Sequence, residues 1–515
     1  MATRLHILDG ARTIGGTKMV LEEDRRGVIL DFGLNYARFG LFFEEFLKPR
    51  APRGLLDYIL TGLLPPYRDL YRDDLFIDHP GLKDMPDLGI KIEAALFSHP
   101  HFDHTGLASF LRDDIPFYGS PGCALTTKAS QDVQSDKMEK EIAYTRPRCR
   151  REWVVKIPKN KGEGEKLAIW RPWRVFADEV SDEFMGFWRD LCLSDAKPEP
   201  TDAEPVGTDF RAGPFRIRSW PVDHSAPGAV AFGIETSAGW IVYTGDIRFH
   251  GYAGGKTERF VEEAAKLSPI RALLIEGTRV GESGTMSEED VFNRAFEVVR
   301  AANGKGVNAE FPLRHPQRLI TFARAAVETG RRLVLMPQDY YTASAIAVSD
   351  PELNEALEDV LIYQDEKSNP KGWEKSLFKR FPEKMVTPQE ITRNIGDYLL
   401  SFRYWVINRL LDIPGFAGGI HIYSTSEPHS EEQEWDLERL RRWLEFFGIT
   451  MIGDPEADPR DPLHASGHAS GDELIRIIEA ISPKEVIPIH TENWGFFKEN
   501  VKCCSVREPG EVVEL

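Results

Sequence analysis

Short apolar runs of strand length recur along the chain, and polar residues follow each of them at once. The stretch 5–31 alternates apolar runs with a Gly-Gly turn and predicts three strands, the last ending at Asp31. Five later runs have the same character: IKIEAALFS before His99, FRIRSWPVD before His224, GWIVYTG before Asp246, IRALLIEG around Glu276 and EVIPI before His490. Ligands in α/β proteins gather beyond the carboxyl ends of strands, so these five ends could build one site. A strand end is also an ordinary place for polar residues, so no single cluster is decisive.

Helical patterns alternate with these strands and give an α/β fold class. Apolar residues at helical spacing predict helices in HTGLASFLRD, TERFVEEAAKL, SEEDVFNRAFEVVRAA, PQRLITFARAAVETG and GDELIRIIEAI. From about 131 to 204 the chain is rich in charged residues, Trp and Pro without a clear period. We interpret this stretch as an insertion with small elements of its own, including a helix in DEFMGFWRDLCL.

Length, composition and charge narrow the classes of protein. A chain of 515 residues exceeds one ordinary core and predicts two or three domains, or one large domain with insertions. No run of about 18 uncharged apolar residues occurs and the N-terminus lacks a signal-peptide pattern, so we expect a cytoplasmic protein without a membrane partner. Five cysteines without CxxC spacing argue against a disulfide framework or a zinc ribbon. A net charge of −18 argues against a broad basic face for duplex nucleic acid, but not against a narrow local groove.

The segment SHPHFDHTG carries His99, His101, Asp103 and His104 in the pattern H-x-H-x-D-H. These residue types are costly to bury unpaired, so packing does not explain them. On an extended backbone His99 and His101 project to one side and can hold one ion, whereas Asp103 and His104 would face a second. Histidine nitrogens and carboxylate oxygens suit zinc or manganese.

Two neighbouring metal ions need a ligand that bridges them, and an aspartate at a strand end suits that role. Asp246 in YTGDIR stands in such a place. His224 in PVDHSAPG and His490 in IPIHTE could each complete the shell of one ion, although His224 taken alone could be an ordinary turn histidine. A hydroxide held between two such ions is a nucleophile at neutral pH, so the predicted reaction is hydrolysis.

The order of these residues resembles the metallo-β-lactamase superfamily, whose hallmark is HxHxDH followed by a distant His, a distant Asp and a last His. Further motifs resemble the β-CASP nucleases, and among them ribonuclease J and the RNA 3′-end processing endonucleases. These motifs are Glu276 in LLIEGT, His468 in HASGHASGDE, the final His490, and GGIHIYSTSEP at 418–428. A histidine at the final position is typical of the RNA-processing members.

The resemblance implies two zinc ions, with manganese as an alternative. One ion would be held by His99, His101, His224 and Asp246, and the other by Asp103, His104, Asp246 and His490. It also implies that Asp103 orients the hydroxide, that His468 acts at the scissile phosphate and that Glu276 orients ligands from behind. The capping-box spacing of Ser470 and Glu473, at the start of an amphipathic helix, independently indicates an anion site beside His468. Ser424 and Ser426 are candidate phosphate contacts, and His464 is either a packing residue or a substrate contact.

The predicted architecture is an αββα metallo-β-lactamase sandwich formed by 1–278 and 463–515, with an α/β β-CASP domain at 279–462 and the active site in the cleft between them. The resemblance covers roughly 5–125 and 206–495. Thr17 replaces the amide of the usual EIGGN turn, and the insertion of about 75 residues is atypical. The chain ends soon after His490, so we expect no C-terminal assembly domain like that of ribonuclease J. The oligomeric state stays open, a homodimer included.

The predicted function is a zinc-dependent nuclease that hydrolyses single-stranded RNA threaded into a narrow channel, to which Arg248, Arg314 and Arg318 are candidate contributors of positive charge. Exonuclease and endonuclease modes are both open. The alternatives are a single-stranded DNA nuclease of the same fold, a small-molecule metallo-hydrolase, and a non-catalytic RNA-binding scaffold. The scaffold is disfavoured because such members lose metal ligands and none is missing here. The small-molecule hydrolase would leave Glu276, His468 and the β-CASP segment unexplained.

Overall fold

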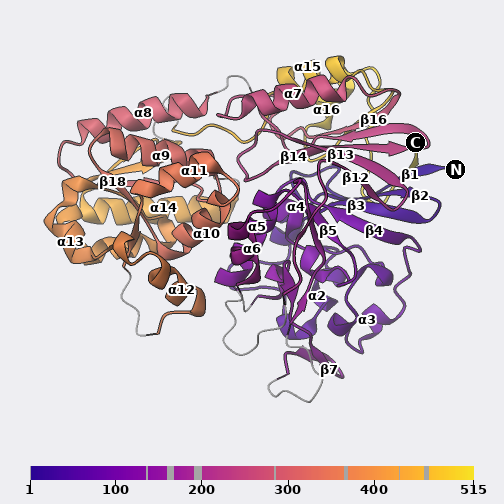
Figure 1. Ribbon diagram of the computed structural model, residues 1–515, viewed down its shortest axis with the longest axis horizontal. Helices are drawn as coiled ribbons and strands as arrows, with labels where there is room; N and C mark the ends of the chain where they lie inside the picture. The colour runs from indigo at the N-terminus through magenta and orange to yellow at the C-terminus, as the bar shows by residue number, and fades with distance from the viewer. Residues whose placement is uncertain are drawn as a thin grey trace. The chain divides into compact units, whose positions relative to one another are not determined.

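The computed structural model describes residues 2–134, 137–158, 168–190, 200–282, 286–364, 369–428, 430–456 and 463–515. The chain forms two compact units (Figure 1). Unit 1 comprises Met1–Phe249, Ala253–Ser283 and Gly467–Leu515, and unit 2 comprises His250–Tyr252 and Gly284–Ser466. Each unit has its own sheets and its own core.

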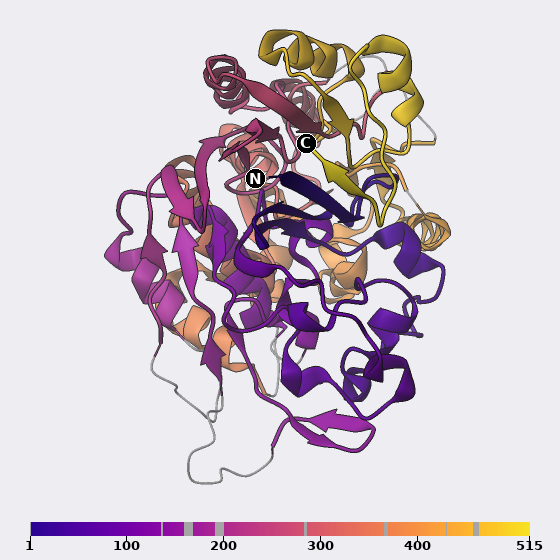
Figure 2. The ribbon, with the colours of Figure 1, turned by 90° about the vertical axis from the view of Figure 1, so that its right-hand side faces the viewer.

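Unit 1 is built on two sheets that share one apolar core. The eight-stranded sheet has the order β11-β10-β5-β4-β3-β2-β1-β25, and the six-stranded sheet has the order β12-β13-β14-β15-β16-β24. The first contains β1 (Thr3–Asp9), β2 (Lys18–Glu23), β3 (Arg26–Phe32), β4 (Lys91–Leu96), β5 (Phe117–Gly119), β10 (Trp173–Val175), β11 (Glu204–Pro205) and β25 (Val512–Glu514). The second contains β12 (Asp209–Ala212), β13 (Phe215–Pro221), β14 (Val230–Thr236), β15 (Gly239–Tyr243), β16 (Ile270–Ile275) and β24 (Val486–Pro488). Strands β1 and β25 pair antiparallel, which brings the two ends of the chain side by side (Figure 2).

The two sheets pack face to face because inward side chains of both strand sets are apolar. Leu30 and Leu96 of one sheet belong to the same buried cluster as Phe232 and Ile241 of the other. Helices cover the outer faces. On the six-stranded sheet these are α7 (Gly254–Ala264), α15 (Gly471–Ile481) and α16 (Trp494–Asn500). On the eight-stranded sheet they are α5 (Pro121–Val133) and α6 (Asp182–Arg189). The predicted αββα sandwich is confirmed.

The predicted insertion is part of unit 1 rather than a separate body. Its strands β10 and β11 extend the eight-stranded sheet, and β10 pairs parallel with β5. Two small antiparallel pairs lie within it: β6 (Tyr144–Thr145) with β9 (Ile169–Trp170), and β7 (Cys149–Arg151) with β8 (Val154–Lys156). The helix predicted in DEFMGFWRDLCL is α6, capped by the Ser181 side chain, and residues 191–193 of that motif lie outside the described residues.

Unit 2 holds a parallel sheet in the order β20-β19-β18-β21-β17-β22-β23. The strands are β17 (Val307–Glu310), β18 (Arg332–Leu335), β19 (Leu361–Tyr363), β20 (Met385–Val386), β21 (Tyr398–Ser401), β22 (Ile420–Tyr423) and β23 (Thr450–Ile452). The helices are α8 (Glu288–Ala301), α9 (Pro316–Glu328), α10 (Pro337–Ala347), α11 (Pro351–Ala356), α12 (Gly372–Arg380), α13 (Pro388–Arg393) and α14 (Glu431–Phe447). Parallel strands buried on both faces require such helical cover.

One predicted helix is wrong. The segment HTGLASFLRD forms only the end of α4 (Phe102–Thr105) and a 3-10 turn at Ala108–Phe110. Its backbone is tied to the end of β3, because the Leu107 N–H donates to the Phe32 carbonyl and the Leu34 N–H to the Phe102 carbonyl. These tertiary bonds override the helical pattern. The other short helices of unit 1 are α1 (Tyr36–Gly40), α2 (Leu56–Leu60) and α3 (Pro80–Lys83). Among the described residues, none of the helices has the length and apolar character needed to span a membrane.

Candidate metal centre

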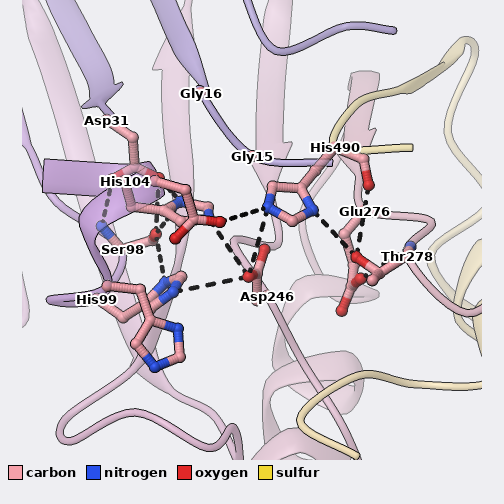
Figure 3. Close-up of polar contacts among 12 residues, drawn as sticks. Gly15, Gly16, Asp31, Ser98, His99, His104, Asp246, Glu276, Thr278 and His490 are labelled. Atoms are coloured by element: carbon pink, nitrogen blue, oxygen red, sulfur yellow. Dashed lines mark hydrogen bonds and ion pairs between the residues drawn. The ribbon is translucent and has the colours of Figure 1, made fainter. Parts of the chain in front are cut away.

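Five strand ends of unit 1 meet at one place and bring the predicted ligands together (Figure 3). Strand β4 leads to His99 and the loop that follows it, β13 to His224, β15 to Asp246, β16 to Glu276 and β24 to His490. The convergence expected from the recurring pattern of strand and polar cluster is therefore present in the fold.

The donor atoms form several overlapping groups, and two of these groups share no residue. One group contains His99, His101 and His224, and the other contains Asp103, His104 and His490, with donor atoms inside each group within 4.8 Å of one another. The His224 Nε2 lies 3.2 Å from the His101 Nδ1, and the His490 Nε2 lies 3.2 Å from Asp103 Oδ2. Tetrahedral zinc with bonds of about 2.0–2.2 Å places its ligand atoms roughly 3.3–3.6 Å apart. The one separation given for each group is thus close to that expected between two ligands of the same ion.

Asp246 lies between the two groups. The distances from its Oδ2 are 3.6 Å to His99 Nε2, 3.3 Å to His104 Nε2, 3.8 Å to His224 Nε2 and 3.8 Å to His490 Nε2. A single carboxylate oxygen is therefore within reach of donors from both groups, which is where a bridging ligand would stand.

The state of the buried donors fits a divalent metal. His99 Nε2, His104 Nε2 and Asp246 Oδ1 are buried and make no hydrogen bond to any described residue. Buried polar atoms normally have a hydrogen-bond partner, and each buried polar atom without one costs about 1–3 kcal/mol of stability. Burial also lowers the pKa of His99 well below its usual value and that of His101 to about 4, so both imidazoles are neutral, as metal binding requires.

Asp31 supports the site and was missed by the sequence prediction. It is fully buried at the end of β3 with a positive φ of 53°. Its Oδ2 accepts hydrogen bonds from His104 Nδ1 at 2.8 Å, from Ser98 Oγ at 2.7 Å and from the Tyr243 hydroxyl, and its Oδ1 accepts one from the Ser98 N–H at 2.8 Å. The bond to His104 fixes the ring with Nε2 toward Asp246. An aspartate closing the buried strand VILDF is the signal that could have revealed it.

Glu276 is fully buried and supports two neighbours. Its Oε1 accepts a hydrogen bond from the Ile247 N–H at 2.9 Å, next to Asp246, and its Oε2 accepts one from His468 Nδ1 at 2.9 Å. Burial alone would lower the pKa of His468, but the Glu276 carboxylate outweighs that effect and raises it to about 9. His468 stands just before α15, whose N-terminus carries the predicted capping box of Ser470 and Glu473.

The glycine turn packs directly against the metal loop. Gly15 has a φ of +80°, and a Cβ there would lie 2.8 Å from the Asp103 Cβ, so only glycine fits. The Gly16 N–H donates to the Asp103 carbonyl. Below the turn, buried Lys18 donates to Asp9 Oδ2 at 3.0 Å and to the Gly16 carbonyl at 3.2 Å.

The remaining candidates belong to unit 2. Ser424 is fully buried, accepts a hydrogen bond from Arg318 Nη1 at 2.8 Å and donates to the Leu463 carbonyl, so its hydroxyl supports the interior of that unit. Ser426 and His464 are both partly buried, and the Ser426 carbonyl accepts from the Tyr423 hydroxyl.

The arginines expected to supply positive charge to a channel require a correction. Arg318 pairs with Glu288 at 2.9 Å and Arg248 with Asp223 at 3.3 Å, and both guanidinium groups are fully buried. Their charges are thus neutralised inside the protein, and the expectation that these two contact the substrate was wrong.

Comparison with known proteins adds to this geometry. Residues 460–493 match a family described as the Zn-dependent metallo-hydrolase RNA specificity domain. Ribonuclease J of Mycobacterium tuberculosis is 23% identical over 470 residues, covering 90% of this chain and 69% of that protein. Ribonuclease J of Mycoplasma pneumoniae is 24% identical (95% and 68% covered), and that of Pyrococcus abyssi is 21% identical (95% and 90% covered). A crystal structure of an Enterococcus faecalis protein of unknown function matches the whole fold with a TM-score of 0.67 at 20% identity, covering 100% of both chains.

Fold, site and sequence matches together define a metal-dependent hydrolase of the metallo-β-lactamase fold. Within that fold, the chain is similar to ribonuclease J proteins over 90% or more of its length.

Proposed function

We propose that this protein hydrolyses phosphodiester bonds of single-stranded RNA with two zinc ions. The observation that carries the proposal is Asp246 Oδ2, which lies within 3.8 Å of His99 and His224 Nε2 and also of His104 and His490 Nε2. Of these atoms, His99 Nε2 and His104 Nε2 are buried and make no hydrogen bond to any described residue. The relatives named ribonuclease J supply the substrate class. We also propose that 279–462 is the β-CASP domain of the chain.

Each ion would take the ligands of one group together with Asp246. His99, His101 and His224 would hold the first, and Asp103, His104 and His490 the second. When bound, such an ion pair supplies a hydroxide nucleophile and neutralises charge on the phosphoryl oxygens; manganese suits the same donors. Burial opposes ionisation of Asp103, but His104 and His490 outweigh it and hold its pKa far below the usual value. An ionised Asp103 can accept a hydrogen bond and so orient the attacking water.

His468 is the proposed donor to the scissile phosphate. Its Nδ1 is held by Glu276, which leaves Nε2 as the atom that can donate a hydrogen bond or a proton. The N-terminus of α15 adds partial positive charge beside it. Glu276 acts through His468 and through the Ile247 amide rather than on the substrate itself.

The alternatives predict different substrates. A single-stranded DNA nuclease would use the same residues on a deoxyribose backbone. A small-molecule hydrolase would use the same metals without a role for His468. Ser424, with its hydroxyl engaged inside unit 2, gives little support to a phosphate contact there, so we keep Ser426 and His464 as the candidates for that role.

The test is cleavage of a 5′-labelled single-stranded RNA and its DNA counterpart by zinc-loaded or manganese-loaded protein. His468→Ala should slow RNA cleavage about 10²–10⁴-fold, the usual contribution of a general acid, and Asp103→Ala should abolish it. His79→Ala, at a partly buried histidine of the same unit that caps α3, is the matched control.

If RNA is cut and both substitutions remove cutting while the fold survives, the proposal stands, and the product ladder separates exonuclease from endonuclease action. If the protein binds two metals and cuts neither strand, the proposal is wrong. Activity on a small ester would then favour the small-molecule hydrolase.

A further inference from the structure

Helix α14 of unit 2, labelled in Figure 1, has aromatic side chains on its exposed face. Three buried leucines join one side of the helix to the core of the unit. The opposite side carries a stripe of residues at spacings of four, three and four, namely Trp435, Arg439, Arg442 and Phe446. Trp435 is 54% exposed and Phe446 is 71% exposed. Trp405 of the adjoining 3-10 helix, Tyr404–Asp412, is 65% exposed. Aromatic residues and arginine are the types enriched where proteins bind one another.

The charges of α14 are divided between its two halves. Residues 431–438 include five carboxylates and no cationic side chain, whereas residues 439–442 include three arginines. The helix macrodipole favours carboxylates near the N-terminus, but it does not account for exposed aromatic rings. Within the helix, Arg439 pairs with Asp436 at 3.0 Å and Arg442 pairs with Glu438 at 2.7 Å. Exposed pairs of this kind contribute little stability, so both arginines can exchange them for carboxylates of another molecule.

We propose that α14 binds α14 of a second copy of this chain, with the two helices antiparallel and related by a two-fold axis. Reversal of one helix places the acidic half of each copy beside the arginines of the other, and the axis makes the two contacts identical. With the axis between Glu438 and Arg439, Trp435 of each copy lies opposite Arg442 of the other. A guanidinium over the face of an indole ring is a favourable contact.

The charge pattern favours a second copy over a strand of RNA as the occupant of this face. A polyanion would meet the five carboxylates of residues 431–438, which repel phosphate groups. A second copy meets the same carboxylates with arginines. The inference goes beyond the proposed function and does not depend on it, because none of the candidate metal ligands among the described residues comes from α14.

The experiment is sedimentation velocity of the full chain at increasing concentration. We expect wild-type protein to pass from monomer to dimer between about 1 and 100 μM, as suits a small interface. Arg439→Glu/Arg442→Glu makes both halves of α14 acidic, and Glu431→Arg/Glu438→Arg reverses two charges of the acidic half. Each variant should weaken self-association about tenfold or more, because like charges then face each other. An equimolar mixture of the two variants should form dimers, because each reversed charge then meets an opposite one.

Two controls separate this contact from a general effect of charge or of an aromatic side chain. Lys375→Glu/Lys379→Glu on α12 makes the same change of charge as the arginine variant at exposed residues of the same unit, and it should leave dimerisation unchanged. Trp435→Ala should weaken the dimer, whereas Trp153→Ala, at an exposed tryptophan of unit 1, should not. Circular dichroism verifies that each variant is folded.

Dimers in the mixture, with each variant alone monomeric, are the expected result. The inference is overturned if wild-type protein stays monomeric up to about 200 μM, if both variants dimerise as wild type does, or if the mixture stays monomeric. If wild-type protein is monomeric and Trp435→Ala weakens binding of a 5′-labelled RNA in EDTA, the stripe contacts RNA and the inference is likewise overturned. Failure to cleave RNA would count against the proposed function alone.

Discussion

The Asp31 carboxylate offers a sharp test of how this centre holds its metal. Its Oδ2 accepts hydrogen bonds from His104, Ser98 Oγ and Tyr243, and its Oδ1 accepts one from the Ser98 N–H. Asn at position 31 would replace one acceptor oxygen with an NH2 group. Whichever way the amide is turned, that group would face donors and leave at least one buried donor unsatisfied, at a cost of about 1–3 kcal/mol.

The consequence for the metal follows from His104. Without a carboxylate behind it, the imidazole is held less firmly and is less basic, and such a loss weakens metal binding roughly 10–100-fold. This corresponds to about 1.4–2.7 kcal/mol at the ion that we assign to Asp103, His104 and His490.

The assay is a zinc competition titration with a chromogenic chelator, with stoichiometry checked by calorimetry. Asp209→Asn is the matched control, because Asp209 is an exposed aspartate of the same unit. We expect one of two sites to weaken in Asp31→Asn and both to be unchanged in the control. Equal zinc affinity in Asp31→Asn and wild type, with circular dichroism unchanged, would refute the reasoning.

Three further predictions follow from the same contacts. Glu276 raises the pKa of His468 to about 9, so the His468 imidazolium persists below that pH and is lost as pH rises through it. Glu276→Gln should therefore move the alkaline decline of the cleavage rate to lower pH, which a pH–rate profile will show. Asp246→Asn should reduce zinc content measured by mass spectrometry from two ions toward none, since both groups lose the shared oxygen; retention of two ions would contradict the bridging role. Lys18→Met should lower the unfolding free energy by about 3–5 kcal/mol in urea titrations, because it removes the buried cation that pairs with the Asp9 carboxylate. A change below about 1 kcal/mol would contradict that.

The residues that support the candidate metal ligands from behind could be only partly predicted from the sequence. Glu276 was assigned an orienting role from its place in LLIEGT, and the structure shows the two contacts through which it can act. The sequence predicted no role for Asp31, because its partners Ser98 and His104 lie 67 or more residues further along the chain. Separations of that length are set by sheet pairing, which no local pattern encodes.

Thr17 illustrates how a departure from a motif is accommodated. Its hydroxyl is buried and makes no hydrogen bond to any described residue. The turn that it follows is supported instead by Lys18, Asp9 and Asn35, since Asn35 Nδ2 also donates to Asp9 Oδ1 at 3.0 Å. The sequence showed that Thr17 stands where the usual turn has an asparagine. Only the fold showed which contacts support the turn without that side-chain amide.

Alternation of strands and helices, and the clusters that end the strands, were determined by the sequence itself. Periodicity depends on neighbours within a few residues, so the strands ahead of His99, His224, Asp246 and His490 and the helices α7, α8, α9 and α15 could be predicted before any contact was known. The chemistry of the ligand types was equally local, because imidazoles and carboxylates are costly to place together without a cation.

Tertiary structure alone decided which chain segments meet. It broke the predicted helix after His104, buried the Ser424 hydroxyl and the Arg318 charge, and placed Lys140 of the insertion over Phe102. Each of these outcomes depends on a partner distant in sequence, whose pairing is chosen by the packing of the whole unit. Burial and long-range contact are properties of that packing, and for this reason the list of residues behind the metal ligands could be completed only in the folded protein.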